Sequence, residues 1–365
     1  MKPLPRMLAL VTDAFGGRGG IAQYNRDFLS ALAKGEVVSS ITVVPRAARG
    51  FYLLPKKIEQ TPARAGRSAY VLAVLREALS RPFDLVFCGH LFMAPLAALI
   101  ARLKGAKLIV QTHGIEAWPR PSYSQLMSAE AADLVLCVSR YTRSAVLNWG
   151  AIVPERILVV SNTVRDIFTP GDGSALRAHL GLQGKRVLLT VARLDSQDRY
   201  KGHERVIAVL PRLVAQGHDV AYVVVGEGYD RARLEAAALR AVGTERVRFV
   251  GEVALQSLIN FYRMADLFVM PSTGEGFGIA FLEAMACGTR SLGLDVAGTK
   301  DALADGQLGT VVPETELAAT IARLLAEPKG DPGTLAAAVR ARFGPEKFAA
   351  GACTALNWLM EAART

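Results

Sequence analysis

The amino-acid sequence predicts an α/β protein built from two doubly wound parallel sheets. Short apolar runs alternate with amphipathic stretches along the chain, and the alternation begins again after about residue 165. Parallel strands appear as continuous apolar runs because helices cover both faces of their sheet. A chain of 365 residues is also too long for one ordinary α/β core and suits two domains.

The predicted strands form two series, one in each half of the chain. Amphipathic segments such as Gly20–Lys34 and Met93–Leu103 separate them and are expected to be helices. The first series comprises Met7–Thr12, Ser40–Val44, Leu85–Cys88, Lys107–Thr112, Leu134–Val138 and Ile157–Val160. The second comprises Arg186–Val191, Ala221–Val225, Val247–Val250, Leu267–Met270, Ser291–Leu294 and Thr310–Val312.

The predicted hinge is the segment Asn162–Gly173, which is rich in turn residues. We therefore expect an N-terminal Rossmann-like domain of residues 1–165 and a C-terminal Rossmann-like domain of residues 166–345. The final amphipathic segment predicts a helix over residues 346–365 that packs back on the N-terminal domain.

The composition is that of a folded globular protein, with 51% hydrophobic and 21% charged residues. No uninterrupted apolar run is long enough to span a bilayer, so we expect no transmembrane helix. The first residues predict a buried strand rather than a signal peptide. The four cysteines are isolated from one another and from histidines at ligand spacing. They are therefore expected to be reduced core residues of a cytoplasmic protein, without structural zinc.

Positive charge is concentrated in the first half of the chain. Residues 1–170 contain 21 lysines and arginines against 11 acidic residues, whereas the remainder contains 22 of each. Between Arg46 and Arg81, eight basic residues and two acidic residues surround the apolar run Phe51–Leu54. This pattern predicts peripheral binding to the anionic inner face of the cell membrane. The alternative is a solvated helix face whose apolar side lies in the core. No nucleic-acid recognition motif is present, so no nucleic-acid partner is expected.

A glycine-rich turn, Phe15–Ala22, follows the first predicted strand and opens the first predicted helix. Gly17, Gly19 and Gly20 would let backbone N–H groups approach an anion at the helix N-terminus. A dinucleotide site would need an acidic residue at the end of the second strand, and none stands there. The turn therefore predicts a donor-facing phosphate loop, with a purely structural tight turn as the alternative.

The strongest motif is the segment Pro271–Ala286, which follows an apolar strand and opens a helix. Glu275 lies in the loop, where a carboxylate can accept hydrogen bonds from sugar hydroxyls. Glu283 lies about two helical turns further on, so it can face the same crevice. The N–H groups around the helix start can bind a phosphate, aided by the helix dipole, at Gly276, Phe277, Gly278 and Ile279.

This segment resembles the E-x7-E motif of the retaining glycosyltransferases of family 4, which have the GT-B fold. The resemblance covers nearly the whole chain. Further matching segments are Thr190–Leu194, Lys201–His203, Val225–Gly228, Phe249–Gly251, Tyr262–Asp266, Gly298–Thr299 and Asp305–Gly309. The sequence departs from the family pattern at Thr163, Ala192, Thr289 and Asp301.

The resemblance implies roles for the matching residues. Arg193 and Lys201 should neutralise the donor diphosphate. The chemistry agrees with this role, because the diphosphate leaving group needs either a metal ion or fixed cations, and the sequence has no D-x-D motif to bind a metal. Glu275 should hold hydroxyls of the transferred sugar, and Glu283 should hold the ribose. His113, at the end of a predicted strand, should face the donor sugar. Base contacts are expected from the loops near Gly228 and Gly251–Leu255, with Gly251 and Val253 as candidates in the second loop.

The resemblance therefore implies a retaining hexosyltransferase that needs no metal or other cofactor. A glucose- or mannose-type sugar would pass from a UDP- or GDP-sugar donor to a glycan or polyprenyl-diphosphate-linked acceptor. The N-terminal domain would bind this acceptor, in bacterial exopolysaccharide, lipopolysaccharide or glycolipid synthesis. A phosphorylase-like enzyme of the same fold and a non-catalytic nucleotide-sugar-binding protein are the alternatives.

Overall fold

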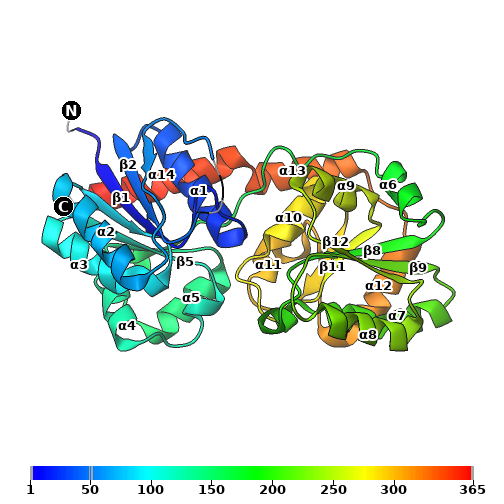
Figure 1. Ribbon diagram of the computed structural model, residues 1–365. Coiled ribbons are helices and arrows are strands. Elements are labelled where there is room, and N and C mark those ends of the chain that lie inside the picture. The colour runs from blue at the N-terminus through cyan, green and yellow to red at the C-terminus, as the bar shows by residue number, and fades with distance from the viewer. Residues whose placement is uncertain (1–2, 49, 51, 363–365) are drawn as a thin grey trace. The chain divides into compact units, whose positions relative to one another are not determined.

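The computed structural model describes residues 3–48, 50 and 52–362, and it divides into two units (Figure 1). Unit 1 comprises Met1–Thr163 and Pro345–Thr365, and unit 2 comprises Val164–Gly344. Phe51 of the predicted membrane-binding run and residues 363–365 of the predicted last helix lie outside the described residues.

Unit 1 contains a seven-stranded parallel sheet with the strand order β3-β2-β1-β4-β5-β6-β7. Its strands are β1 (Arg6–Val11), β2 (Ser40–Pro45), β3 (Ile58–Gln60), β4 (Leu85–Cys88), β5 (Lys107–Thr112), β6 (Leu134–Cys137) and β7 (Ile157–Val159). Its helices are α1 (Gly20–Lys34), α2 (Arg67–Ser80), α3 (Ala94–Lys104), α4 (Tyr123–Glu130), α5 (Arg140–Trp149) and α14 (Pro345–Ala362). Helices α1 and α14 cover one face of the sheet, and α2 to α5 cover the other (Figure 1).

Helix α14 belongs to unit 1 although it ends the chain. It packs along α1, and its side chains Phe348, Leu356 and Leu359 are buried. The ring of Phe348 meets that of Tyr24 edge-on, with 5.6 Å between the ring centroids. The apolar side of the last helix therefore lies in the core of the first unit.

Strand β3 is an element that the sequence analysis did not predict. It pairs with β2 at the edge of the sheet, inside the basic stretch between Arg46 and Arg81. Only Ile58 of its three residues is buried, so the strand has no apolar run to reveal it. The side-chain amide of Gln60 donates a hydrogen bond to the carbonyl oxygen of Phe15 at 2.9 Å, so this edge strand also supports the glycine-rich turn.

Unit 2 contains a six-stranded parallel sheet with the strand order β10-β9-β8-β11-β12-β13. Its strands are β8 (Arg186–Val191), β9 (Val220–Val225), β10 (Val247–Gly251), β11 (Leu267–Met270), β12 (Ser291–Leu294) and β13 (Thr310–Val312). Its helices are α6 (Ser174–His179), α7 (His203–Ala215), α8 (Arg231–Val242), α9 (Leu255–Met264), α10 (Ile279–Ala286), α11 (Thr299–Ala302), α12 (Leu317–Ala326) and α13 (Pro332–Phe343). Helices α7, α8 and α12 cover one face, and α9, α10 and α13 cover the other (Figure 1).

The predicted fold class, with two parallel doubly wound sheets, is confirmed. In each sheet the first strand of the unit lies inside the sheet, third in the strand order, and the order reverses beside it. Ligands of open α/β sheets bind outside the carboxyl ends of the strands at this reversal. In unit 1 the reversal lies between β1 and β4, and in unit 2 it lies between β8 and β11.

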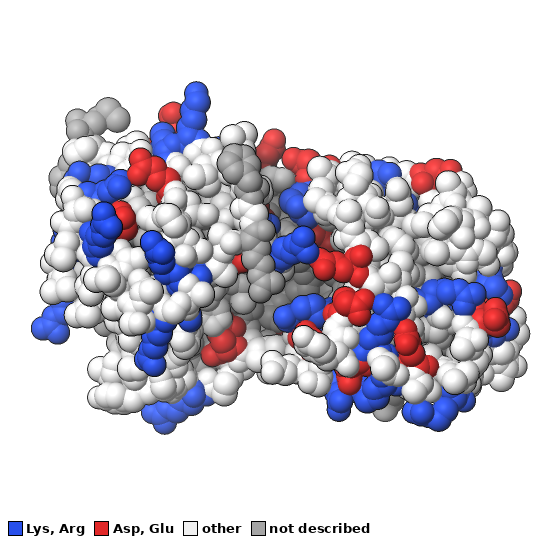
Figure 2. All heavy atoms as spheres, viewed as in Figure 1, with Lys and Arg blue, Asp and Glu red and all other residues white. Residues whose placement is uncertain are grey.

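Surface charge differs between the two units. On the face drawn in Figure 2, lysines and arginines outnumber acidic residues over unit 1, whereas the two kinds are mixed over unit 2. This agrees with the uneven charge along the sequence. Within the described residues, we find no helix with the length and apolar character needed to cross a membrane.

Candidate functional site

Lys201 and Glu275 form a largely buried ion pair at the carboxyl edge of the unit 2 sheet. Lys201 ends the short helix η4 (Ser196–Lys201) after β8, and Glu275 lies in the loop between β11 and α10. The Nζ atom of Lys201 lies 2.5 Å from Oε1 of Glu275, and their side chains are 17% and 7% exposed. Burial lowers the pKa of Lys201, but Glu275, Tyr200 and Asp198 together more than offset this, and the pKa is raised. Lys201 is therefore a fixed cation at neutral pH.

Close backbone packing holds these two loops together. Gly202 has a φ of +85°, and a Cβ atom at this position would lie 2.3 Å from the carbonyl oxygen of Pro271. Thr273 donates its backbone N–H to the carbonyl oxygen of Tyr200 at 2.9 Å. The positions of Lys201 and Glu275 therefore depend on the close approach of Gly202 to Pro271 and on a backbone hydrogen bond between the two loops.

Arg193 follows the same strand, β8, but its guanidinium group is exposed. Its Nη2 atom donates to Oδ1 of the buried Asp198 at 3.1 Å, and the Arg193 side chain is 73% exposed. Asp198 therefore orients the guanidinium group and leaves other N–H donors facing solvent.

Helix α10 begins beside Glu275. Its N-cap, Gly278, has a φ of +101°, and a Cβ atom there would lie 2.7 Å from the ring of Phe281. The side chain of Phe277 is buried and its ring meets that of Phe343 edge-on. Phe277 can therefore offer a ligand its backbone but not its side chain. Gly276 and Ile279 are half-buried, so the start of α10 is accessible.

Glu283 lies on α10 in a buried polar cluster. The hydroxyl group of Tyr262 donates to Oε2 of Glu283 at 2.8 Å, and Nη2 of Arg165 lies 3.9 Å from Oε1. Burial raises the pKa of Glu283 to about 7, against the lowering effects of the Tyr262 hydrogen bond and the Arg165 charge. The hydroxyl group of Thr289 donates to the carbonyl oxygen of Tyr262 at 2.6 Å, which fixes the end of α9.

Gly251 and Val253 lie at the end of β10. Gly251 forms an isolated antiparallel bridge with Gly226, whose N–H donates to the Gly251 carbonyl oxygen at 2.9 Å. Val253 is half-buried. A Cβ atom on Gly251 would lie 3.2 Å from a carboxylate oxygen of Glu227, which pairs with Arg231 at 2.9 Å. The loops after β9 and β10 therefore meet at this edge.

In unit 1, the glycine-rich turn is a fixed structure. Gly17 donates its N–H to the carbonyl oxygen of Ala14 at 3.2 Å. Nη1 of Arg26 donates to the carbonyl oxygens of Ala14 and Gly17 at 2.9 and 2.8 Å. Gly19 and Gly20 are exposed at the start of α1, so the N–H groups of its first turn can be approached from solvent.

His113 follows β5 at the same edge of the unit 1 sheet. Its Nε2 atom lies 2.9 Å from the carbonyl oxygen of Gly89, and its backbone N–H donates to the Glu116 carboxylate. Burial lowers the pKa of His113, and Glu116 and the Gly89 carbonyl oppose this. Because a carbonyl oxygen only accepts, Nε2 carries the hydrogen and Nδ1 is the acceptor of the neutral ring.

A cavity of 250 Å³ lies at the carboxyl edge of unit 1, bordered by Arg46 after β2 and by Phe92 after β4. The guanidinium group of Arg46 lies over the ring of Phe92, 5.3 Å from its centroid, and Arg67 lies at the same cavity. The remaining lining residues are Tyr70, Val71, Met93, Pro95, Leu96, Ser122, Ser124 and Gln125. This wall combines cations and hydroxyl groups with apolar side chains.

Each unit brings together part of the predicted residue set. Unit 2 places Lys201 against Glu275, with Glu283 on the helix that begins there. Tyr262 lies in a segment that matches the family pattern, but its contact with Glu283 was not predicted, and neither was the support that Arg26 gives to the glycine-rich turn. Among the described residues, no cluster of three or more His, Cys, Asp or Glu side chains suits a metal ion.

Comparison with known proteins identifies two family models. Residues 18–166 match the model described as Glycosyltransferase Family 4, and residues 174–341 match the model described as Glycosyl transferases group 1. Together these matches cover most of both units.

Individual relatives align along most of the chain. A GDP-mannose-dependent alpha-(1-6)-phosphatidylinositol monomannoside mannosyltransferase of Mycolicibacterium smegmatis is 30% identical, over 88% of this chain and 90% of the relative. A D-inositol 3-phosphate glycosyltransferase of Kribbella flavida is 29% identical, over 85% and 78% of the two chains. HepE of Anabaena, solved in complex with UDP and glucose, superposes with a TM-score of 0.79 at 21% identity, covering 97% of this chain and 99% of that one.

Proposed function

Because the chain belongs to the family 4 glycosyltransferases and is a glycosyltransferase with the GT-B fold, we propose that it transfers a hexose from a nucleotide diphosphate sugar with retention of configuration. The proposed acceptor is a glycan or a polyprenyl-diphosphate-linked lipid, in bacterial cell-surface polysaccharide or glycolipid synthesis.

The observation that supports this proposal most directly is the buried pair of Lys201 and Glu275 beside the start of α10. Transfer releases a nucleoside diphosphate, whose developing negative charge must be stabilised. Lys201 supplies a fixed positive charge, and the free N–H groups at the start of α10 supply further donors. Glu275 has a second carboxylate oxygen that can accept hydrogen bonds from sugar hydroxyls.

The remaining predicted residues complete the donor site in this proposal. The exposed guanidinium group of Arg193 binds the diphosphate, and the carboxylate of Glu283 accepts hydrogen bonds from the ribose. The neutral His113 ring faces the transferred sugar, and the backbone at Gly251 and Val253 contacts the base. Gly17, Gly19 and Gly20 offer backbone N–H groups to the donor from unit 1.

The nucleotide is proposed to be UDP or GDP, and the sugar to be of the glucose or mannose type. The mycobacterial relative is described as GDP-mannose-dependent, and HepE was solved with UDP and glucose. Both descriptions fit a hexosyltransferase, and neither favours one nucleotide for this chain.

The proposed reaction needs no metal ion. The acceptor oxygen attacks the anomeric carbon on the face from which the diphosphate departs. The bond from that carbon to the diphosphate oxygen breaks, and a phosphate oxygen of the leaving group takes the acceptor proton. Fixed cations and positioning then supply most of the lowering of the barrier. Full activity in excess EDTA and an α-linked product from an α-linked donor are the expected results.

Turnover of labelled UDP-glucose and GDP-mannose tests the donor site. Lys201→Met and Glu275→Gln should each lower kcat/KM by about a hundredfold or more, as removal of groups that stabilise transition-state charge does. The matched controls are Lys185→Met, a lysine paired with Asp219 before β8, and Glu245→Gln, which alters an exposed acid. Wild-type turnover in either site variant, measured where circular dichroism shows a folded protein, would refute the site.

The acceptor is proposed to bind unit 1 at an anionic membrane surface. Leu72 and Leu79 of α2 are 68% and 79% exposed, and Arg76 lies between them on the same exposed face. Exposed leucines with a basic residue suit the interface of an anionic bilayer. Tyr52 and Leu53, elsewhere in unit 1, are also exposed.

Vesicle flotation tests this surface. Wild-type protein should float with phosphatidylglycerol vesicles at low salt, and the double change Leu72→Glu and Leu79→Glu should prevent it. The matched control is Leu239→Glu on α8, where an exposed leucine of unit 2 is changed. Equal flotation of both variants, or none by the wild type, would rule out this membrane surface.

A further inference from the structure

A second cavity lies at the opposite edge of the unit 2 sheet from Glu275. It has a volume of 470 Å³ and is bordered by Asp266 and Arg290, which directly precede β11 and β12. Because the strands are parallel, this is the amino edge, whereas Glu275 follows the carboxyl end of β11. The cavity is therefore distinct from the proposed donor site.

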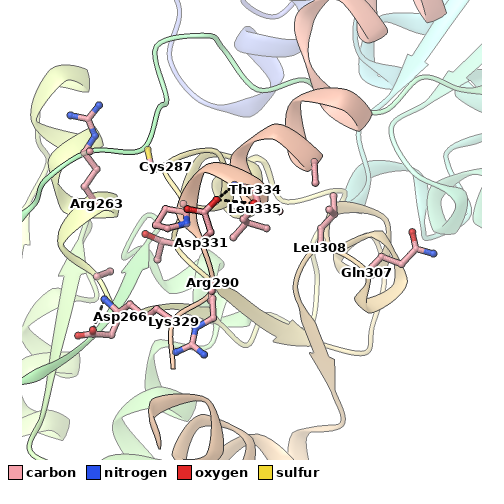
Figure 3. A pocket seen from close by; sticks show the side chains of 17 residues that line it. Arg263, Asp266, Cys287, Arg290, Gln307, Leu308, Lys329, Asp331, Thr334 and Leu335 are labelled. Carbon is pink, nitrogen blue, oxygen red and sulfur yellow. Dashed lines mark hydrogen bonds and ion pairs between the residues drawn. The ribbon is translucent and has the colours of Figure 1, made fainter. Parts of the chain in front are cut away.

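Both carboxylates that border this cavity are already engaged (Figure 3). Asp266 accepts from Nζ of Lys329 at 2.6 Å, from Nη2 of Arg177 at 2.5 Å and from the N–H of Val187 at 2.7 Å. Asp331 accepts from the N–H and hydroxyl groups of Thr334 and caps α13. These carboxylates therefore have little capacity left to bind a cationic ligand.

Arg290 is a lining cation without a close carboxylate partner. Its Nη2 atom donates to the carbonyl oxygen of Leu324 at 2.6 Å, and its Nη1 atom lies 3.5 Å from that of Pro328. The nearest carboxylate, that of Glu327, lies 4.0 Å away and is also paired with Arg323. Burial lowers the pKa of Arg290, and the charges of Glu327 and Asp266 oppose this only in part, because Arg186 and Arg323 also lower it. An anion in the cavity would add to this incomplete charge compensation.

The rest of the wall is largely apolar. Helix α13 contributes Pro332, Leu335 and Ala338, and Leu308 and Cys287 come from other segments of unit 2. Pockets of this size, apolar with a few convergent polar groups, typically hold small organic molecules.

We propose that this cavity is a binding site for a small organic anion. A phosphate or carboxylate group of the ligand is held by Arg290, and its apolar body lies along Pro332, Leu335 and Ala338.

The cavity is linked to the proposed donor site by direct contacts. Thr289 lines the cavity, and its hydroxyl group donates to the carbonyl oxygen of Tyr262 at 2.6 Å. The Tyr262 hydroxyl in turn donates to Glu283 at 2.8 Å. A ligand packed against Thr289 orders the residues that hold Glu283, so the cavity regulates nucleotide affinity. This link rests on the proposed function.

Calorimetric titration of the full-length protein with phenyl phosphate tests the cavity itself. Phenyl phosphate carries both the anionic group and the apolar body, whereas inorganic phosphate and benzyl alcohol each carry one of them. Phenyl phosphate should bind most tightly, and Arg290→Gln should weaken it by about tenfold to a hundredfold, as expected for a hydrogen bond to a charged group. Arg212→Gln, an exposed arginine on α7, is the control.

A second variant keeps the test independent of Arg290, whose loss could disturb the fold. Ala338→Trp should fill the cavity and abolish phenyl phosphate binding, whereas Ala337→Trp, at the next exposed position of α13 and outside the wall, should not. The double variant Lys201→Met and Glu275→Gln should keep this binding, which separates the cavity from the donor site. Unchanged binding in Ala338→Trp, or no binding by the wild type, would overturn the proposal.

Titration of UDP and GDP with and without saturating phenyl phosphate tests the link. Phenyl phosphate should lower the Kd of the nucleotide by about fivefold or more, and the nucleotide should lower the Kd of phenyl phosphate by the same factor. Thr289→Val should lose this coupling. If phenyl phosphate does not change the affinity for the nucleotide, the proposed link to the donor site is wrong, but the proposed binding site in the cavity is unaffected. If neither nucleotide binds at all, the proposed donor site fails instead.

Discussion

Glu283 is a buried acid whose environment disfavours its ionised form. In the folded protein its pKa is raised to about 7 from an ordinary 4.5, because burial outweighs the Tyr262 hydrogen bond and the Arg165 charge. Between these two values the folded state binds the proton and the unfolded state does not. This contribution to stability is therefore fully present below the unfolded pKa and is lost as the pH rises through 7.

Glu283→Gln is expected to raise the free energy of unfolding above neutral pH, where wild-type Glu283 is ionised and buried. The gain should reach at most about 3–4 kcal/mol, from about 1.4 kcal/mol for each unit of pKa shift, and should disappear in mild acid. Urea unfolding of both proteins across pH measures it. The variant should also bind the nucleotide more weakly, because a neutral amide accepts hydrogen bonds from ribose less strongly than a carboxylate. A difference in stability that does not change with pH would contradict this account.

The pair of Lys201 and Glu275 is expected to contribute to both stability and catalysis. Lys201→Met leaves a buried carboxylate unpaired, and Glu275→Gln leaves a buried ammonium group unpaired. Each single change should lower the free energy of unfolding by about 3–5 kcal/mol, because one charge loses its compensation. The double variant should regain much of the lost free energy of unfolding, but it should remain inactive. Additive losses in a urea-unfolding double-mutant cycle would refute this coupling.

The sequence predicted which residues gather at the site, but not how individual side chains are oriented there. Lys201 and Glu275 were predicted as one group and lie 2.5 Å apart, because parallel strands bring the loops after their carboxyl ends to one edge. The buried ring of Phe277 was not anticipated, because a motif does not show which side of a loop a side chain takes. Tyr262 was overlooked as a partner of Glu283, because their contact depends on how α9 packs against α10.

At the scale of elements, the loop after β8 approaches the loop after β11 only because Gly202 lacks a side chain. Gly202→Ala would place a Cβ atom 2.3 Å from the carbonyl oxygen of Pro271, so the loop that carries Lys201 must move. Gly217 has the same φ of +85° but open space around its Cβ position. Alanine substitutions at the two positions therefore distinguish the cost of backbone strain, which both share, from the cost of close packing, which only Gly202 has.

Gly217→Ala should cost about 1–2 kcal/mol of stability, the penalty for a left-handed residue with a side chain, and leave turnover unchanged. Gly202→Ala should cost more and also lower turnover of the donor sugar, because Lys201 moves away from Glu275. Urea unfolding and the labelled-donor assay measure the two effects. Equal losses of stability in the two variants would show that close packing at Pro271 has no role.

Strand prediction succeeded where apolar runs are long and failed at the edge of the sheet. Leu85–Cys88 and Lys107–Thr112 were predicted with the bounds that β4 and β5 have, because central strands are buried on both faces. Strand β3 was missed because it buries only Ile58 and relies on its pairing with β2. A three-residue edge strand carries too little pattern to be distinguished from a loop.

At the scale of the whole molecule, each unit has its own hydrophobic core. Residues of α2 to α5 pack on the unit 1 sheet, and residues of α7, α8 and α12 pack on the unit 2 sheet. Unit 1 is completed by α14, which is separated from it in the sequence by all of unit 2. Its stability therefore depends on the last helix of the chain, whereas unit 2 is continuous in sequence.

Two unfolding transitions that respond to different changes are expected in calorimetry. Leu356→Ala on α14 removes a side chain that is 1% exposed, and it should destabilise unit 1 by about 2–5 kcal/mol, the usual cost of a cavity in the core. UDP or GDP at about a hundred times its Kd should stabilise unit 2 by about 2.7 kcal/mol through mass action. The exposed control Leu239→Ala on α8 should shift neither transition appreciably. A single transition that both Leu356→Ala and the nucleotide shift would show that the two cores unfold as one, and the assignment of α14 to an independent unit would then be wrong.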